Sequence, residues 1–145
     1  IQKINENFRK NLKKMIPIFE NINFDFLKNT EFQEDETKSY LRNILFQNDK
    51  FELILIKWKP KSESLIHDHS INGCILKVID GKLEETLYNK NIKLIKETIY
   101  QKGNINYIDN QIGYHKIKNL NLEPTYSIHL YSPPNHTVNY FKIIY

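Results

Sequence analysis

The chain has 145 residues, of which 40% are hydrophobic and 26% charged, with a formal net charge of +4. This length suits one domain with a single core, and the composition excludes an intrinsically disordered chain. The lysines are scattered without a basic run, which argues against nucleic-acid binding, and the apolar runs are too short to cross a membrane. The single cysteine excludes an intrachain disulfide and favours a reducing compartment, so we expect a cytoplasmic protein.

The first part of the chain predicts a helix. Apolar residues recur every three or four positions with charged residues between them, which is the pattern of an amphipathic helix: Ile4, Phe8, Leu12, Met15, Ile16 and Phe19. This helix is expected to end around Pro17–Glu20, and Asn21–Lys38 has room for a second short helix. We therefore assign residues 1–38 to a helical segment that packs on the rest of a single domain.

The residues from 39 to 145 predict an antiparallel β-domain. A hairpin is expected first, with strands Tyr40–Phe46 and Phe51–Trp58. Further strands are expected at Ser64–His69, Cys74–Ile79, Lys82–Tyr88, Ile92–Tyr100, Ile105–Ile108, His115–Lys118, Tyr126–Tyr131 and Thr137–Ile144. Short strands at this spacing are typical of a sandwich or a jelly-roll barrel, whose interior can hold one small ligand. The predicted fold class is all-β, with a short N-terminal helical cap.

Two histidines two positions apart suggest a metal-binding pair. On a β-strand, His67 and His69 project from one face and Asp68 from the other. Two such imidazoles can hold a transition metal, although two half-exposed histidines on a strand are the alternative. His115, with Asn119 downstream, supplies a third imidazole, for which a surface loop histidine is the alternative. Together the spacing matches the outline of a cupin metal site, and cupins are double-stranded β-helix barrels.

Cys74 stands where many cupins carry a glutamate ligand, judged by its spacing to Gly81. The expected ligand set is therefore three neutral histidines, His67, His69 and His115. Such a set leaves coordination positions open and the full charge of the metal available to an anionic ligand such as a thiolate.

The stretch after Thr125 places Ser127, His129 and Tyr131 on one face of a strand. A serine hydrolase is excluded, because residues two apart on one strand lack the elbow and the third group that activate a serine. A solvent-facing strand is the alternative. The favoured interpretation is a hydrogen-bonded relay in the pocket, in which His129 orients the Tyr131 hydroxyl near the metal.

Arg42 shares its strand face with Tyr40. An isolated arginine is usually a solvated surface residue, but on a face that lines the barrel its guanidinium would bind a carboxylate. Trp58 is assigned to the core or the pocket wall, and His136 to a structural role in a loop.

From about Tyr40 to Pro134 the chain resembles the cysteine dioxygenases, non-haem iron enzymes that oxidise cysteine to cysteine sulfinate. The similar segments are Tyr40-Leu-Arg42-Asn43, Phe51–Trp58 followed by Ile66-His-Asp-His69, Ile112-Gly-Tyr-His115 with Asn119, and Ser127-Ile-His129-Leu-Tyr131-Ser-Pro-Pro134. The resemblance implies a cupin-type double-stranded β-helix and a mononuclear non-haem Fe(II) held by His67, His69 and His115. It also implies a monomer that acts on L-cysteine and O2 in cysteine catabolism.

The resemblance further implies roles for the other site residues. The cysteine thiolate and amine would bind the metal, while its carboxylate pairs with Arg42 beside Tyr40 and Tyr131. Cys74 and Tyr131 fall on the positions of the family's thioether cross-link, although a buried small hydrophobe is the alternative for Cys74. The Ser132–Pro133 bond is implied to be cis. The residues assigned to catalysis are Ser127, His129, Tyr131 and Cys74.

The chain departs from the pattern at several positions. Gly73 stands where vertebrate members carry a histidine, Val138 where they carry a second pocket cysteine, and Lys57 replaces an uncharged residue.

Two alternative functions stay open: a related thiol dioxygenase acting on 3-mercaptopropionate or a protein N-terminal cysteine, and a non-catalytic metal-binding cupin. Arg42 favours the free amino acid, because relatives that use 3-mercaptopropionate tend to have glutamine there and peptide substrates lack a free α-carboxylate.

Overall fold

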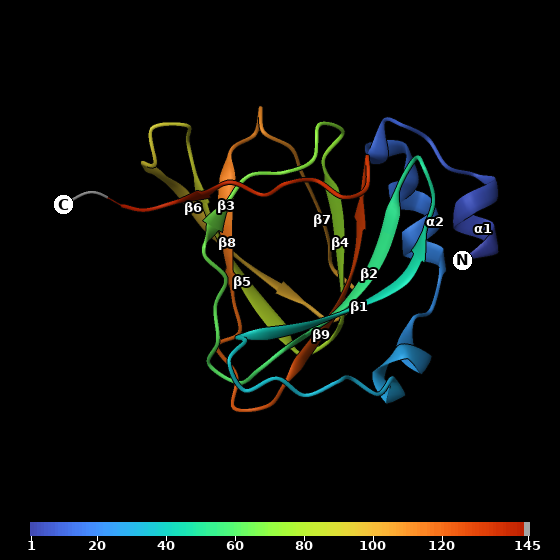
Figure 1. The fold of residues 1–145 in the computed structure, drawn as a ribbon, viewed down its shortest axis with the longest axis horizontal. Coiled ribbons are helices and arrows are strands. Elements are labelled where there is room, and N and C mark those ends of the chain that lie inside the picture. Colours follow the sequence, from blue (N-terminus) through green and yellow to red (C-terminus); the bar gives the residue numbers. More distant parts are fainter. Residues whose placement is uncertain (144–145) are drawn as a thin grey trace.

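A computed structural model describes residues 1–143 of the chain, which fold into two antiparallel five-stranded sheets that face each other (Figure 1). The first sheet has the order β1 (Tyr40–Gln47), β2 (Glu52–Trp58), β9 (Thr125–Tyr131), β4 (Cys74–Asp80) and β7 (Ile105–Ile108). The second has the order β10 (Tyr140–Phe141), β3 (Ile66–His67), β8 (Tyr114–Lys118), β5 (Lys82–Tyr88) and β6 (Leu94–Gln101). The all-β fold with a helical N-terminal part is as predicted.

The first sheet is buried on both faces, which explains why its central strands β2, β4 and β9 are so rich in apolar residues. One face carries Leu53, Ile75 and Leu130 and packs under the N-terminal helices. The other face carries Ile54 and Leu76 and looks into the space between the sheets. Because side chains alternate along a strand, every second residue of β2, β4 and β9 points into the barrel.

The N-terminal part is not one continuous helix, so that prediction was wrong. It forms α1 (Gln2–Glu6), the 3-10 turn η1 (Leu12–Met15), α2 (Ile16–Asn21) and the 3-10 turn η2 (Asp25–Asn29). The side chain of Asn11 accepts a hydrogen bond from the Lys13 backbone N–H and starts a new turn. Pro17, expected near the helix end, lies in the first turn of α2, where its missing N–H costs no hydrogen bond.

The apolar periodicity nevertheless marks the buried side of this segment. Ile4, Leu12, Met15 and Phe19 are fully buried against the outer face of the first sheet, where Figure 1 shows the helices lying. No helix among residues 1–143 has the length and apolar character needed to cross a membrane. The assignment of residues 1–38 and 39–145 to separate segments of one domain stays a prediction.

Two strands are much shorter than predicted. Of Ser64–His69 only Ile66–His67 is a strand, and of Thr137–Ile144 only Tyr140–Phe141; Ile144 lies outside the described residues. These two short strands pair with each other, and beside them Asp68 accepts hydrogen bonds from the His136 side chain and from the backbone and side chain of Asn139. The Ser132–Pro133 bond is cis, as the resemblance implies.

Candidate metal centre

Three histidines from neighbouring segments of the second sheet converge between the sheets. His67 lies at the end of β3 and pairs with His115 on β8, while His69 follows two residues later. Their ligand atoms all lie within 4.8 Å of one another. The spacing in the sequence predicted this convergence; the role of the three residues as metal ligands stays a proposal.

His67 and His115 turn lone pairs toward each other. His67 Nδ1 lies 2.7 Å from the Leu65 carbonyl oxygen, and His115 Nδ1 lies 2.8 Å from Glu85 Oε2. Both oxygens accept hydrogen bonds, so each Nδ1 carries the proton and each Nε2 is unprotonated. The two Nε2 atoms are 3.1 Å apart, where two lone pairs repel. A cation bound by both nitrogens removes that repulsion.

His69 is oriented in the same way by Asn110. The Asn110 side-chain oxygen accepts the His69 backbone N–H at 2.8 Å and lies 3.3 Å from His69 Nδ1, while the Asn110 amide donates to the His69 carbonyl at 3.1 Å. The Nδ1 proton therefore points at Asn110. His69 Nε2 is buried and has no hydrogen-bond partner among the described residues. A buried lone pair without a donor is costly unless a ligand satisfies it.

The electrostatics keep all three rings in the ligating form. Burial lowers the pKa of His67 and lowers that of His115 far below its usual range. For His69, burial and the neighbouring His115 and His67 lower the pKa to about 2. Neutral imidazoles are the form that binds metals. Two nitrogen ligands about 2.1 Å from a metal and at right angles are about 3.0 Å apart, close to the 3.1 Å between His67 Nε2 and His115 Nε2.

Glu85 is a site residue that the sequence analysis missed. It lies on β5 beside the strand of His115, and its Oε2 also accepts a hydrogen bond from Asn106 at 2.7 Å. Burial raises the pKa of this carboxyl. By accepting the Nδ1 proton of His115, Glu85 fixes the tautomer whose Nε2 faces the other histidines. The available signal was a charged residue at the centre of the apolar alternation Leu83-x-Glu85-x-Leu87.

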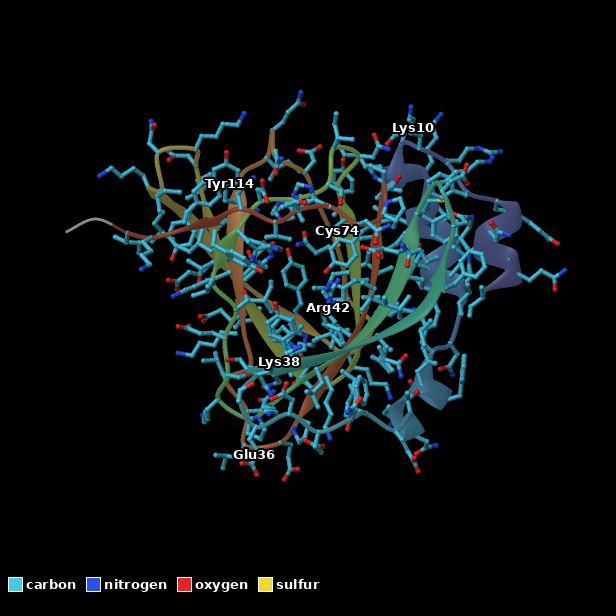
Figure 2. All side chains as sticks on the ribbon, in the orientation of Figure 1. Lys10, Glu36, Lys38, Arg42, Cys74 and Tyr114 are labelled. Carbon is cyan, nitrogen blue, oxygen red and sulfur yellow. The ribbon has the colours of Figure 1, made fainter. Side chains whose placement is uncertain are left out.

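A cavity of about 360 Å³ opens next to the three histidines and is lined by both sheets. Tyr40 and Arg42 line it from β1, as predicted from their shared strand face. The Tyr40 ring packs on Trp58, with ring centroids 4.7 Å apart, so Trp58 forms part of the wall. Figure 2 shows Arg42 and Cys74 in the space between the two sheets.

A chain of hydrogen bonds runs along β9 toward this cavity. Trp58 Nε1 donates to Ser127 Oγ at 2.9 Å, and Ser127 Oγ lies 2.7 Å from His129 Nε2. The only acceptor for the Ser127 hydroxyl proton among the described residues is His129 Nε2, so His129 Nδ1 carries a proton. That atom lies 3.0 Å from the Tyr131 oxygen and donates to it. The Tyr131 hydroxyl therefore keeps its own proton for another acceptor, and Tyr131 lines the cavity.

Cys74 lies directly opposite Tyr131, on the neighbouring strand β4. Its sulfur is 4.0 Å from His129 Nδ1, and burial raises the pKa of the thiol far above its usual range. Cys74 contributes no atom to the histidine cluster found among the described residues. Its position therefore matches the neighbour of Tyr131 that the resemblance implies, not a metal ligand.

Asp68 fastens the C-terminal segment across the cavity. Its Oδ1 accepts hydrogen bonds from His136 Nε2 and the Asn139 backbone N–H, both at 2.9 Å, and its Oδ2 accepts from the Asn139 side chain at 2.8 Å. Because β3 ends at His67, strand alternation does not fix the direction of Asp68, which lines the cavity together with the flanking histidines. Figure 1 shows the segment, in red, passing from β9 to β3. His136 and Val138 from this segment line the cavity.

Asn119 does not belong to the site, although it formed part of the sequence outline. Its fully buried amide donates to the carbonyl oxygens of Trp58, Lys59 and Glu123. It therefore ties together the loops that follow β2 and β8.

Solved structures that resemble the chain are cupin-type proteins. A protein with a double-stranded β-helix domain from Klebsiella pneumoniae matches with a TM-score of 0.62 and 18% identity, over 77% of this chain and 92% of that one. The cupin domain of Cnp3 from Schizosaccharomyces pombe matches with a TM-score of 0.58 and 16% identity, over 73% and 70%. At these identities the similarity concerns the fold alone, and it confirms the predicted cupin-type double-stranded β-helix.

Sequence comparison identifies the family. Cysteine dioxygenase type 1 of Bos taurus is 40% identical over 110 residues, and that of Homo sapiens is 38% identical over 110 residues; each match covers 70% of this chain and 55% of the relative. The chain thus spans about half the length of the curated relatives it matches. The family model described as cysteine dioxygenase type I matches residues 5–143, and the chain belongs to that family.

Proposed function

We propose that the chain is a thiol dioxygenase that uses Fe(II) to oxidise free L-cysteine to cysteine sulfinate. The observation that supports it most is the convergence of three imidazole lone pairs, those of His67, His69 and His115, beside a cavity that carries Arg42. Family membership supports the reaction. In that reaction the thiol R–SH and O2 give R–SO2H, so both oxygen atoms end on sulfur and the product is a sulfinic acid.

The three histidines would hold the iron by their Nε2 atoms. Bound Fe(II) would supply positions for the thiolate and amine of the substrate and would activate O2. Because the histidines are neutral, they leave the metal charge available to an anionic sulfur. Glu85, Asn110 and the Leu65 carbonyl hold the rings in the orientation that this binding requires.

The substrate carboxylate would pair with Arg42. This side chain lines the cavity and forms no ion pair with a described residue, so its donors are available to a ligand. The Tyr131 hydroxyl, oriented by His129, would donate to the bound substrate, and Tyr40 would close the pocket beside it. Cys74 would form the thioether cross-link with Tyr131, its partner across β4 and β9: the new C–S bond would replace the Cys74 S–H bond and a ring C–H bond of Tyr131, and O2 would take up the two protons and two electrons. We keep the cytoplasm as the predicted location and the monomer as the predicted state.

The proposal is tested by O2 uptake. Protein loaded with Fe(II) without air is mixed with O2 and either L-cysteine or 3-mercaptopropionate, and the products are identified by mass. We expect uptake with L-cysteine, with one sulfinate formed per O2 consumed, and none by the iron-free protein. Preference for 3-mercaptopropionate would support the related thiol dioxygenase instead. If iron is bound but O2 is consumed with neither thiol, the result would support the alternative of a non-catalytic metal-binding cupin.

A further inference from the structure

Glu52 is a charged residue in the cavity wall, which also carries Arg42 and the hydrogen-bonded Asp68. It begins β2 and is only 6% exposed. Strand alternation places its side chain on the same face as Ile54 and Ile56, which looks into the barrel, and Glu52 lines the cavity together with Arg42. Its carboxylate thus adds a negative group to the cavity that Arg42 lines with a positive one.

Glu52 has no partner within the fold. Among residues 1–143 its carboxylate makes no hydrogen bond or ion pair, unlike Glu85 and Asp68, which are the other acids buried beside the site and are hydrogen-bonded. The carboxylate oxygens of Glu52 are not among the fully buried atoms without a partner, so they open into the cavity. Such a residue is explained when its partner is a ligand that arrives from the cavity.

The surroundings of Glu52 indicate where that ligand lies. Across the sheet, Glu52 stands opposite Tyr131, which stands opposite Cys74. Burial is the main cause of the high pKa of Tyr131; Arg42 opposes the shift and Glu52 adds to it, so both charges act on this hydroxyl. Arg42 and Glu52 do not form an ion pair with each other. Arg42, Glu52 and Tyr131 thus line the same cavity, which offers a ligand a cation, an anion and a hydroxyl.

We propose that Glu52 is a specificity-determining residue: it accepts a hydrogen bond from an N–H of the substrate amino group, whose nitrogen lone pair would bind the metal while the substrate carboxylate pairs with Arg42. This inference rests on the proposed function and extends it to the substrate class, which is a thiol carrying both an amino group and a carboxylate. A substrate with both groups satisfies both cavity charges. A thiol with a carboxylate and no amine, such as 3-mercaptopropionate, leaves Glu52 unpaired and adds a negative charge next to it.

The test measures binding, so that it does not depend on turnover. Fe(II)-loaded protein is titrated without air by calorimetry with L-cysteine, cysteamine and 3-mercaptopropionate. The variant is Glu52→Gln, which keeps the shape and removes the charge. The control is Glu97→Gln, which removes one negative charge from the exposed face of β6. Thermal unfolding of all three proteins is measured in parallel.

We expect Glu52→Gln to weaken binding of L-cysteine and cysteamine by about tenfold, the usual effect of losing the charge in a charge-assisted hydrogen bond. Binding of 3-mercaptopropionate should be unchanged or tighter, so the preference for cysteine falls. Glu97→Gln should leave all three affinities as they are. The Tm of Glu52→Gln should equal or exceed that of the parent, because no bond within the fold is lost.

Two results would overturn the inference while the proposed function stands. One is an unchanged ratio of cysteine to 3-mercaptopropionate affinity in Glu52→Gln, with cysteine still bound. The other is a Tm clearly lower than that of Glu97→Gln, which would mean that Glu52 has a structural partner. Failure of the parent protein to bind any of the three thiols would overturn the proposed function, and this inference with it.

Discussion

Replacement of Glu85 by glutamine tests how the fold prepares the histidines for a metal. The carboxylate accepts the Nδ1 proton of His115 at 2.8 Å, and the two side chains are only 3% and 6% exposed, so solvent and salt screen the contact little. Glutamine keeps the shape and an acceptor oxygen, and its amide can face Tyr100, whose hydroxyl lies 3.5 Å from the other carboxylate oxygen. The change therefore removes the charge of the acceptor and little else.

The expected magnitude follows from this contact. A hydrogen bond to a charged group contributes about 1.5–3 kcal/mol and one between neutral groups about 0.5–1.5 kcal/mol. Glu85→Gln should therefore weaken the hydrogen bond to His115 by roughly 1–1.5 kcal/mol. Since 1.4 kcal/mol is tenfold, affinity for Fe(II) should fall by about tenfold, the lower end of the usual effect of changing a residue that supports a metal ligand.

The assay is competition for Fe(II) with a chromophoric chelator in the absence of air. Glu84→Gln is the matched control, because Glu84 is the next residue on β5 and points to the other face of the strand. The reasoning is refuted if Glu85→Gln binds Fe(II) as tightly as the parent, or if Glu84→Gln is weakened equally.

Three further predictions concern the cavity and its loops. Arg42→Ala should lower kcat/KM for L-cysteine by about tenfold or more, measured by O2 uptake; unchanged kinetics would remove Arg42 from the site. Cys74→Ser should abolish the cross-link seen by mass spectrometry and keep Fe(II) affinity, whereas loss of iron would make Cys74 a ligand. Burial would raise the pKa of Asp109, but hydrogen bonds from Tyr107 and two backbone N–H groups lower it. Its stabilisation is therefore present above its ordinary pKa of 3.8 and is lost as pH falls through the lower folded value. Asp109→Ala should lower Tm by roughly 3–6 °C near neutral pH, with the difference narrowing in acid; a pH-independent difference would contradict this.

Residues close together in the sequence, or fixed by strand alternation, could be predicted. Alternation brings Tyr40 and Arg42 to one face of β1, and both line the cavity. The apolar period of the first 20 residues predicted which side chains are buried, although the hydrogen bond from Asn11 to the following turn breaks the helix that the period suggested.

Contacts that depend on strand register could not be predicted from the sequence. Glu85 reaches His115 only because β5 pairs with β8, and Glu52 faces Tyr131 only because β2 pairs with β9. His136 lies in a loop, as predicted, but its partner Asp68 is 68 positions away in the sequence and could not be predicted. Asn119 was named only as part of the motif that follows His115; that its amide ties two loops together depends on contacts with Trp58 and Glu123 that the motif does not show.

The most direct test of the central claim is the fate of isotopically labelled O2. Fe(II)-loaded protein is given L-cysteine under ¹⁸O2, and the product is analysed by mass spectrometry. The account predicts cysteine sulfinate in which both sulfinate oxygens are labelled. A product with one labelled oxygen, or cystine with no labelled oxygen, would contradict a dioxygenase built on these three histidines.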